Sequence, residues 1–129
     1  MITYKTTTKK GFGRGKTLGF PTINMEIPDV LLQEQRGIYA AKVTIGGVQC
    51  DAALYFGPPI TFGVTTEQLE VYLLDATHFE HLILGESIEC THYAFIRPVA
   101  TFPDSESLVM QMHQDIERVR DELREVPRE

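Results

Sequence analysis

The stretch from Gly37 to Leu54 alternates between apolar and polar residues, and this period of two constrains the fold more than any other feature. One face of its first half is apolar and holds Tyr39, Ala41, Val43 and Ile45. Lys42 and Thr44 occupy the other face, which indicates a half-buried strand. The alternation resumes after Gly46-Gly47, at Val48, Cys50, Ala52 and Leu54. Because paired glycines supply the positive φ angles of a tight turn, the pattern predicts an antiparallel hairpin.

Two further apolar runs, Leu69 to Leu74 and Ile88 to Ile96, are typical of strands, and a short strand is also expected at 82–84. The end of the chain changes period. Apolar residues recur there at spacings of four, four, three and four: Leu108, Met112, Ile116, Val119 and Leu123. This stripe predicts one C-terminal helix, with a start signal at 104–107 and a stop at Pro127.

Several short antiparallel strands followed by one helix favour a mainly β fold. We expect a closed or partly closed Greek-key barrel with the helix packed outside, since closure leaves no exposed strand edge. The 129 residues, of which 43% are hydrophobic and 23% charged, are enough to bury one core. We therefore expect a single domain across residues 1–129.

The formal net charge of -6 argues against nucleic acid or an anionic membrane surface as a partner. No apolar run is long enough to span a bilayer and no secretion signal is apparent, so we expect a cytoplasmic protein. Cys50 and Cys90 lie far apart on predicted strands and are expected to be buried apolar residues. The four histidines form no recognisable ligand set, so no structural zinc site is expected.

A glycine-rich segment near the N-terminus carries the residues most suggestive of chemistry: Gly11, Phe12, Gly13, Arg14, Gly15, Lys16, Thr22 and Asn24. Glycines allow backbone N–H groups to approach phosphate oxygens closely. The segment is no Walker A loop, because the first required glycine is replaced by Lys10 and no helix pattern follows. It also lacks the last glycine of the dinucleotide fingerprint. From composition alone, an ordinary flexible turn explains the segment equally well.

The order of motifs resembles the riboflavin kinase family. The resemblance lies in Gly13-Arg14-Gly15, in the run Leu18 to Asn24, and in Gly37-Ile38-Tyr39. It continues in the run Leu69 to Asp75, in Phe95 to Pro98, and in Phe102 to Leu108. These motifs occur in family order along nearly the whole chain.

The resemblance implies a six-stranded barrel and the transfer of the γ-phosphate of ATP to the ribityl 5′-hydroxyl of riboflavin, giving FMN. It implies that Thr22 and Asn24 bind Mg²⁺ and nucleotide phosphate oxygens, and that Glu70 is the general base. It also makes Phe12, Arg14 and Lys16, with the glycines around them, candidates for nucleotide contact. Without the resemblance, Thr22 and Asn24 fit a turn, Glu70 a solvent-facing strand residue and Lys16 a solvated turn.

Arg97 ends a strand before Pro98, and two interpretations remain open for it. The resemblance implies a loop that closes over the flavin, where a guanidinium could hold a phosphate. Arg97 could equally order the loop before the helix through hydrogen bonds to carbonyl groups.

The chain also departs from the family pattern. Tyr55 stands where the family usually has asparagine, and Ile60 where it has proline, which puts nucleotide affinity or selectivity in question. An FMN adenylyltransferase domain, common in bacterial relatives, is not apparent, so we expect a separate enzyme to convert FMN to FAD. The alternative functions are a related barrel that binds flavin or nucleotide without phosphoryl transfer, and a structural or protein-interaction barrel.

Overall fold

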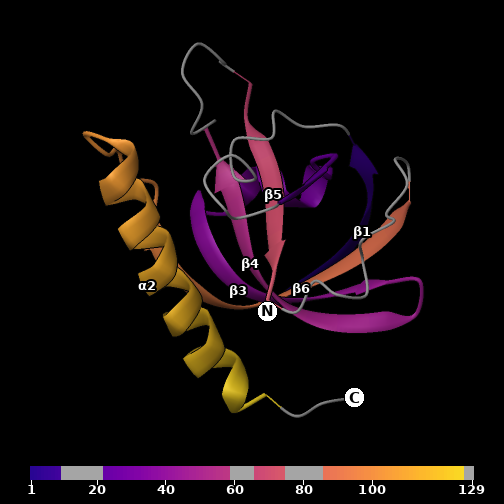
Figure 1. Ribbon diagram of the computed structural model, residues 1–129. Coiled ribbons are helices and arrows are strands. Elements are labelled where there is room, and N and C mark those ends of the chain that lie inside the picture. The colour runs from indigo at the N-terminus through magenta and orange to yellow at the C-terminus, as the bar shows by residue number, and fades with distance from the viewer. Residues whose placement is uncertain (10–21, 59–65, 75–85, 127–129) are drawn as a thin grey trace.

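The structure is a computed structural model that describes residues 1–9, 22–58, 66–74 and 86–126. Six strands form a closed barrel in the order β1-β2-β5-β4-β3-β6, and every neighbouring pair is antiparallel. The strands are β1 (Ile2–Lys9), β2 (Ile23–Met25), β3 (Gly37–Ile45), β4 (Val48–Gly57), β5 (Gln68–Leu73) and β6 (Ser87–Pro98). One helix, α2 (Ser105–Arg124), lies outside the barrel beside β3 and β4 (Figure 1). The predicted fold class is confirmed.

The hairpin between β3 and β4 forms where the alternation predicts it. Its two strands pair from Gly37↔Phe56 to Ile45↔Val48, which leaves only Gly46 and Gly47 for the turn. Both glycines have positive φ, 58° and 81°. Because a side chain strains this conformation, the turn requires glycine for its backbone geometry.

The prediction that β3 is half-buried is wrong. Ile38 and Ala40 on its outer face pack with Val119 and Leu123 of the helix, so the strand lies between two apolar layers. Lys42 is only 5% exposed, and its Nζ lies 3.2 Å from a carboxylate oxygen of Asp51. The strand is therefore buried on both faces, because the helix covers the face that the sequence pattern suggested was solvated.

The barrel interior is the main core. Its fully buried side chains include Met25, Leu31, Val43, Leu54, Phe56, Leu69, Val71 and Ile88. Cys50 and Cys90 are buried, as predicted. The interior also holds polar groups: the hydroxyl of Tyr4 lies 2.7 Å from Nε2 of His92.

Helix α2 begins where the sequence indicates. Asp104 is the N-cap, and its carboxylate accepts a 2.8 Å hydrogen bond from the backbone N–H of Ser107. The predicted apolar stripe differs in one respect, because Met112 and Ile116 are half-buried whereas Asp115 is buried. Pro127 and the strand expected at 82–84 lie outside the described residues. Among the helices of the described chain, none is long and apolar enough to cross a membrane.

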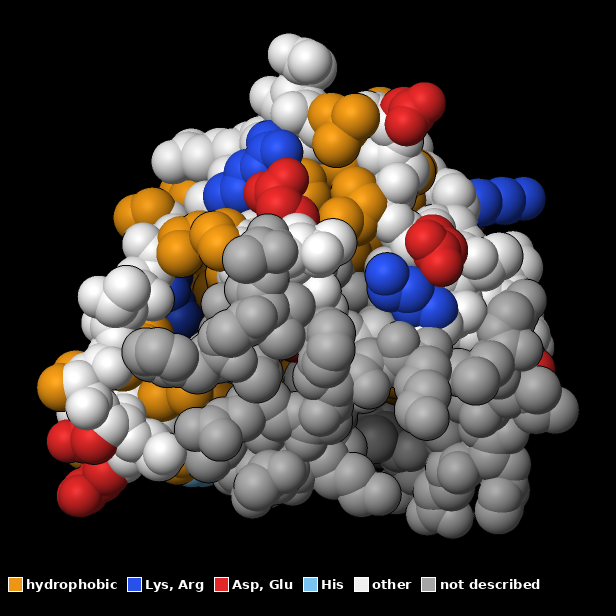
Figure 2. Space-filling model, turned by 90° about the horizontal axis from the view of Figure 1, so that it is seen from above, with side chains coloured by type: hydrophobic (Ala, Val, Ile, Leu, Met, Phe, Trp, Pro, Cys, Tyr) orange, Lys and Arg blue, Asp and Glu red, His pale blue; other side chains and the backbone are white. Residues whose placement is uncertain are grey.

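The face in Figure 2 has a mixed surface. Basic and acidic side chains of the described residues lie next to one another there, with hydrophobic side chains between them (Figure 2). Nucleic acid binding typically uses a concentrated basic patch. The described residues on this face mix the two signs of charge instead, and the net charge of the chain is -6.

Candidate active site

A row of side chains crosses five neighbouring strands on the outer face of the barrel. Cross-strand pairing aligns Asn24 on β2, Glu70 on β5, Tyr55 on β4, Ile38 on β3 and Arg97 on β6. Directly opposed residues in antiparallel strands point to the same face of the sheet. The neighbours of Glu70 along β5, Leu69 and Val71, point into the core, so this row faces outward toward α2.

A pocket of about 60 Å³ lies between part of this row and the helix. The barrel side of the pocket consists of Thr22, Ile38, Ala53, Tyr55, Glu70, Tyr72 and Arg97. The helix side consists of Leu108, Met112, Asp115 and Ile116. A pocket with many apolar walls and a few convergent polar groups is the usual form of a small-molecule site.

Glu70 is half-buried in this pocket. Burial raises the pKa of its carboxyl group, because removal from water penalises the charged form. A carboxylate with a raised pKa is a stronger base than an exposed one, which suits it to accept a proton from a bound hydroxyl group. The alternation of β5 thus directs the carboxyl group of Glu70, which is capable of acid–base chemistry, toward the pocket.

Two further polar residues lie close to Glu70: Thr22 lines the same pocket, and Asn24 is the neighbour of Glu70 in the sheet. Asn24 pairs directly with Glu70 between β2 and β5, and it is only 5% exposed. In the described part of the chain its Oδ1 has no hydrogen-bond partner, which is costly for a buried acceptor unless a ligand or solvent satisfies it. Hydroxyl and amide oxygens in such a place fit a hard cation such as Mg²⁺.

No group of three or more His, Cys, Asp or Glu residues gathers into a metal-binding cluster in the described ranges. Mg²⁺ commonly keeps several waters and binds phosphate oxygens with few protein ligands. The donors at Thr22 and Asn24 therefore fit an ion that arrives with a phosphate-bearing substrate better than one held in a protein cage.

Arg97 connects the row to the helix. Its Nε and Nη2 each donate a 2.8 Å hydrogen bond to Asp115, and Nη1 donates a 3.1 Å bond to the carbonyl of Pro98. Gln111 also donates to Asp115, at 3.0 Å. These contacts order the chain after β6 and anchor the helix to the barrel. Direct contact of Arg97 with a substrate stays a prediction.

Asp115 is the pocket residue that the sequence reasoning missed. It is 3% exposed, and it falls between Met112 and Val119 at spacings of three and four, inside the apolar stripe. A charged residue at a core-facing helix position is expected to have a buried partner. The charged Asp115 within the apolar stripe could therefore have indicated a buried ion pair, but the sequence could not identify Arg97 as its partner.

Tyr55, which departs from the family pattern, also lies on the pocket. Its hydroxyl donates a short hydrogen bond to the carbonyl of Pro58, so it is already engaged. Burial, with a smaller contribution from the charge of Glu70, raises the pKa of Tyr55 to about 12. A Cβ atom at Gly57 would lie 3.0 Å from a side-chain carbon of Val99 and 3.1 Å from that hydroxyl, so a larger residue there would crowd both.

The structure brings together Thr22, Asn24, Glu70 and Arg97 of the residues selected from the sequence. Six others lie outside the described residues: Gly11, Phe12, Gly13, Arg14, Gly15 and Lys16. Ile60 lies outside them as well. The roles assigned to all of these residues stay predictions.

Comparison with known proteins decides the family. The family model described as riboflavin kinase matches residues 1–123. The chain belongs to the riboflavin kinase family. A curated relative, the bifunctional riboflavin kinase/FMN adenylyltransferase of Listeria monocytogenes, is 35% identical over 92% of this chain and 37% of its own length. The chain spans less than half the length of the curated relatives that it matches.

Solved structures share the fold of this riboflavin kinase family member. A crystal structure described as a macrolide-efflux protein from Streptococcus pneumoniae has a TM-score of 0.78 and 28% identity, covering 93% of this chain and 38% of that one. Riboflavin kinase from Trypanosoma brucei has a TM-score of 0.69 and 20% identity, covering 96% and 80% of the two chains. The second likeness shows that the barrel architecture persists at low identity.

Proposed function

We propose that the chain transfers the γ-phosphate of ATP to the ribityl 5′-hydroxyl of riboflavin, so that ATP and riboflavin become ADP and FMN. The observation that carries the proposal is the juxtaposition of Glu70 and Asn24 in one cross-strand pair at an apolar pocket. Membership of the riboflavin kinase family supports the same reaction.

Glu70 is the proposed general base. Phosphoryl transfer depends mainly on positioning and on charge stabilisation, with one group orienting the attacking hydroxyl and taking its proton. Its carboxylate lies on the pocket wall and has a raised pKa, so it can accept the proton of the 5′-hydroxyl as the oxygen–phosphorus bond forms. The bond from the γ-phosphorus to the bridging oxygen breaks, and the leaving group is ADP.

Thr22 and Asn24 are the proposed protein ligands of Mg²⁺ and of nucleotide phosphate oxygens. Bound Mg²⁺ supplies neutralisation of phosphate charge. The unpartnered Oδ1 of Asn24 supports this assignment, because a buried acceptor without a partner is rare. The glycine-rich residues, Gly11 to Lys16, are proposed to contact the nucleotide.

The apolar part of the pocket is proposed to hold the flavin ring. Leu108, Met112 and Ile116 on the helix and Ile38 and Ala53 on the barrel supply apolar walls that suit contact with a flat apolar ring system. In this proposal the ring lies against the helix, and the ribityl chain is directed toward Glu70.

We place the reaction in the cytoplasm, and we propose that an FMN adenylyltransferase uses its product. Several curated relatives carry both activities in their names. FMN is the product of the kinase activity and the substrate of the adenylyltransferase activity, whether the two lie in one polypeptide or in separate enzymes.

Incubation of the purified chain with riboflavin, ATP and Mg²⁺ tests the proposal, with FMN measured by chromatography. CTP and GTP in parallel reactions test the nucleotide, and EDTA tests the need for a divalent cation. We expect FMN with ATP and none with EDTA. Flavin binding without FMN from any nucleotide would contradict phosphoryl transfer and favour a non-catalytic flavin-binding barrel.

A further inference from the structure

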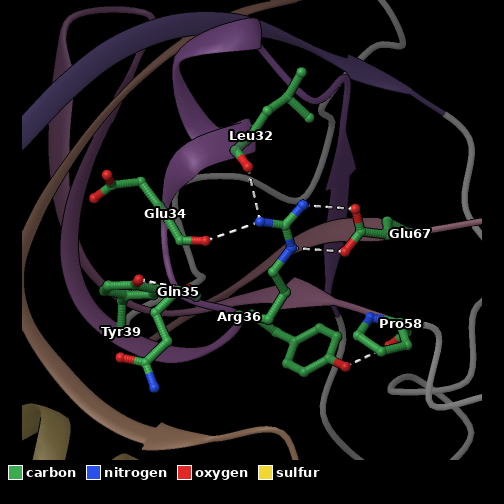
Figure 3. A network of polar contacts seen from close by, with 8 residues as sticks. Leu32, Glu34, Gln35, Arg36, Tyr39, Pro58 and Glu67 are labelled. Atoms are coloured by element: carbon green, nitrogen blue, oxygen red, sulfur yellow. Dashed lines mark hydrogen bonds and ion pairs between the residues drawn. The ribbon is translucent and has the colours of Figure 1, made fainter.

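Arg36 lies at the centre of a network of contacts at one end of the barrel (Figure 3). Its Nε and Nη2 donate hydrogen bonds of 2.8 and 2.9 Å to the two carboxylate oxygens of Glu67. Its Nη1 donates to the carbonyls of Leu32 and Glu34, at 3.0 and 2.9 Å. A planar guanidinium group held by four hydrogen bonds has a fixed orientation.

The same guanidinium group lies over the ring of Phe56, 4.4 Å from its centroid. Phe56 is fully buried near the end of β4, so Arg36 covers the core at this opening of the barrel. The hydrogen bonds from Arg36, with a smaller contribution from its charge, lower the pKa of Glu67, which keeps the pair ionised at neutral pH. Arg36 thus joins the residues before β3, the end of β4 and the residue before β5.

The strands joined in this way are those that carry the proposed catalytic groups. In the described residues β2 and β5 share only two paired positions, Ile23↔Val71 and Asn24↔Glu70. By contrast, β3 and β4 share nine. The alignment of Asn24 with Glu70 therefore depends on few sheet contacts. A second connection runs from β2 through the turn η1 (Asp29–Gln33) to Arg36, and then through Glu67 to β5.

We propose that Arg36 is a positioning residue for phosphoryl transfer: through Glu67 it fixes the start of β5 against the β2–β3 connection, and thereby holds Glu70 in register with Asn24. This inference rests on the proposed function. The hydrogen-bond partners of Arg36 in the described residues are Glu67, Leu32 and Glu34, and none of them lines the pocket, so Arg36 acts through the strands and not on the substrate.

A purely stabilising role predicts a different outcome. The side chains of Arg36 and Glu67 are 31% and 37% exposed, and ion pairs this accessible to solvent usually contribute little to stability. A displacement of reacting groups by about 1 Å, however, can lower a rate by about 100-fold. Loss of Arg36 is therefore expected to affect turnover more than binding or folding.

The test compares Arg36→Met, Arg36→Lys, Glu67→Gln and the double variant R36M/E67Q with the parent. Arg124→Met is the matched control, because Arg124 forms an exposed ion pair with Asp121 on the helix. Values of kcat and of KM for riboflavin and ATP are measured well below the unfolding temperature. Amide hydrogen exchange of Leu69, Glu70 and Val71 is measured in the same proteins without substrate.

We expect Arg36→Met to lower kcat by about 10-fold with both KM values within about twofold, as for a misplaced catalytic group. Amide exchange at Glu70 is expected to accelerate. Arg36→Lys retains the charge, so its kcat is expected to lie between those of Arg36→Met and the parent. The double variant R36M/E67Q is expected to be no slower than Arg36→Met alone. Arg124→Met is expected to match the parent.

Parental kcat and parental exchange at Glu70 in Arg36→Met would overturn the inference, as would a lowered unfolding temperature with unchanged kcat. If Arg36→Met does not fold, Arg36→Lys and Glu67→Gln carry the same comparison, because each retains part of the contact. If the parent makes no FMN, the proposed function fails by itself. The exchange measurement then decides the positioning role, and equal exchange in Arg36→Met and Arg124→Met would overturn it.

Discussion

Glu70 owes its chemical character to the side of β5 on which it lies. The alternation of Leu69, Glu70 and Val71 predicts from sequence alone that the carboxylate points away from the core. The sequence could not predict that Asn24 lies beside it, because that neighbour depends on pairing between strands 46 positions apart in the chain. The environment that raises the pKa of Glu70 likewise appears only when the helix closes over the barrel.

Replacement of Glu70 tests its role as the base. Glu70→Gln keeps the shape of the side chain but cannot take up the proton, so kcat should fall by about 10²- to 10⁴-fold. Riboflavin affinity, measured by flavin fluorescence, should change little. Glu117→Gln on the exposed side of the helix is the control. A parental kcat would show that Glu70 is an ordinary strand glutamate.

Replacement of the proposed metal ligands should weaken binding of Mg·ATP while the fold remains intact. Thr22→Ala and Asn24→Ala each remove an oxygen donor, and the lost Oδ1 of Asn24 has no protein partner whose bond would be broken. Calorimetry with Mg·ATP measures the effect, with the exposed Thr101→Ala as control. Parental affinity in both variants would show that the ligand assignment is wrong, and unfolding would favour the alternative of a structural turn.

At the scale of elements, local patterns predicted the β3–β4 hairpin and the start of α2 because each depends on residues close in sequence. Gly46-Gly47 defines the turn, and Asp104 caps the helix. The pairing of Arg97 with Asp115 could not be predicted, since it depends on the packing of α2 onto the barrel. The burial of Lys42, which pairs with Asp51 on β4, likewise depends on tertiary packing that no local pattern shows. The helix therefore contributes a wall of the site as well as covering the core.

The Arg97–Asp115 ion pair should be important for holding the helix in place. Asp115→Asn leaves the mostly buried guanidinium group without its counter-charge, and the free energy of unfolding should fall by about 2–4 kcal/mol. Urea denaturation measures the change. Asp121→Asn removes the partner of the exposed Arg124 and should change stability by about 0.5 kcal/mol or less. Equal effects of the two substitutions would contradict an anchoring role.

For the molecule as a whole, closure of the barrel places polar groups in a dry interior. His92 is 3% exposed and contacts the rings of Tyr4 and Tyr39, and its buried Nδ1 has no hydrogen-bond partner among the described residues. Burial, together with the charge of the N-terminus, lowers the pKa of His92 from 6.5 to about 4. The folded barrel thus favours the neutral imidazole.

This shift makes stability depend on pH. Because the unfolded chain binds the proton first, the contribution of His92 is complete above about pH 6.5 and is lost as the pH falls to about 4. The free energy of unfolding should decrease by up to about 3 kcal/mol across this window. Urea denaturation at several pH values measures it. His92→Gln should show a shallower dependence, and identical curves for the two proteins would contradict the assignment.

Transfer of isotope tests directly whether this barrel moves a phosphoryl group from ATP to riboflavin. The purified chain is incubated with riboflavin, Mg²⁺ and ATP labelled in the γ-phosphate, and FMN and ADP are separated and counted. We predict one labelled FMN for each ADP formed, and almost none with Glu70→Gln. ADP without labelled FMN, or no turnover of either substrate by the parent protein, would contradict the account.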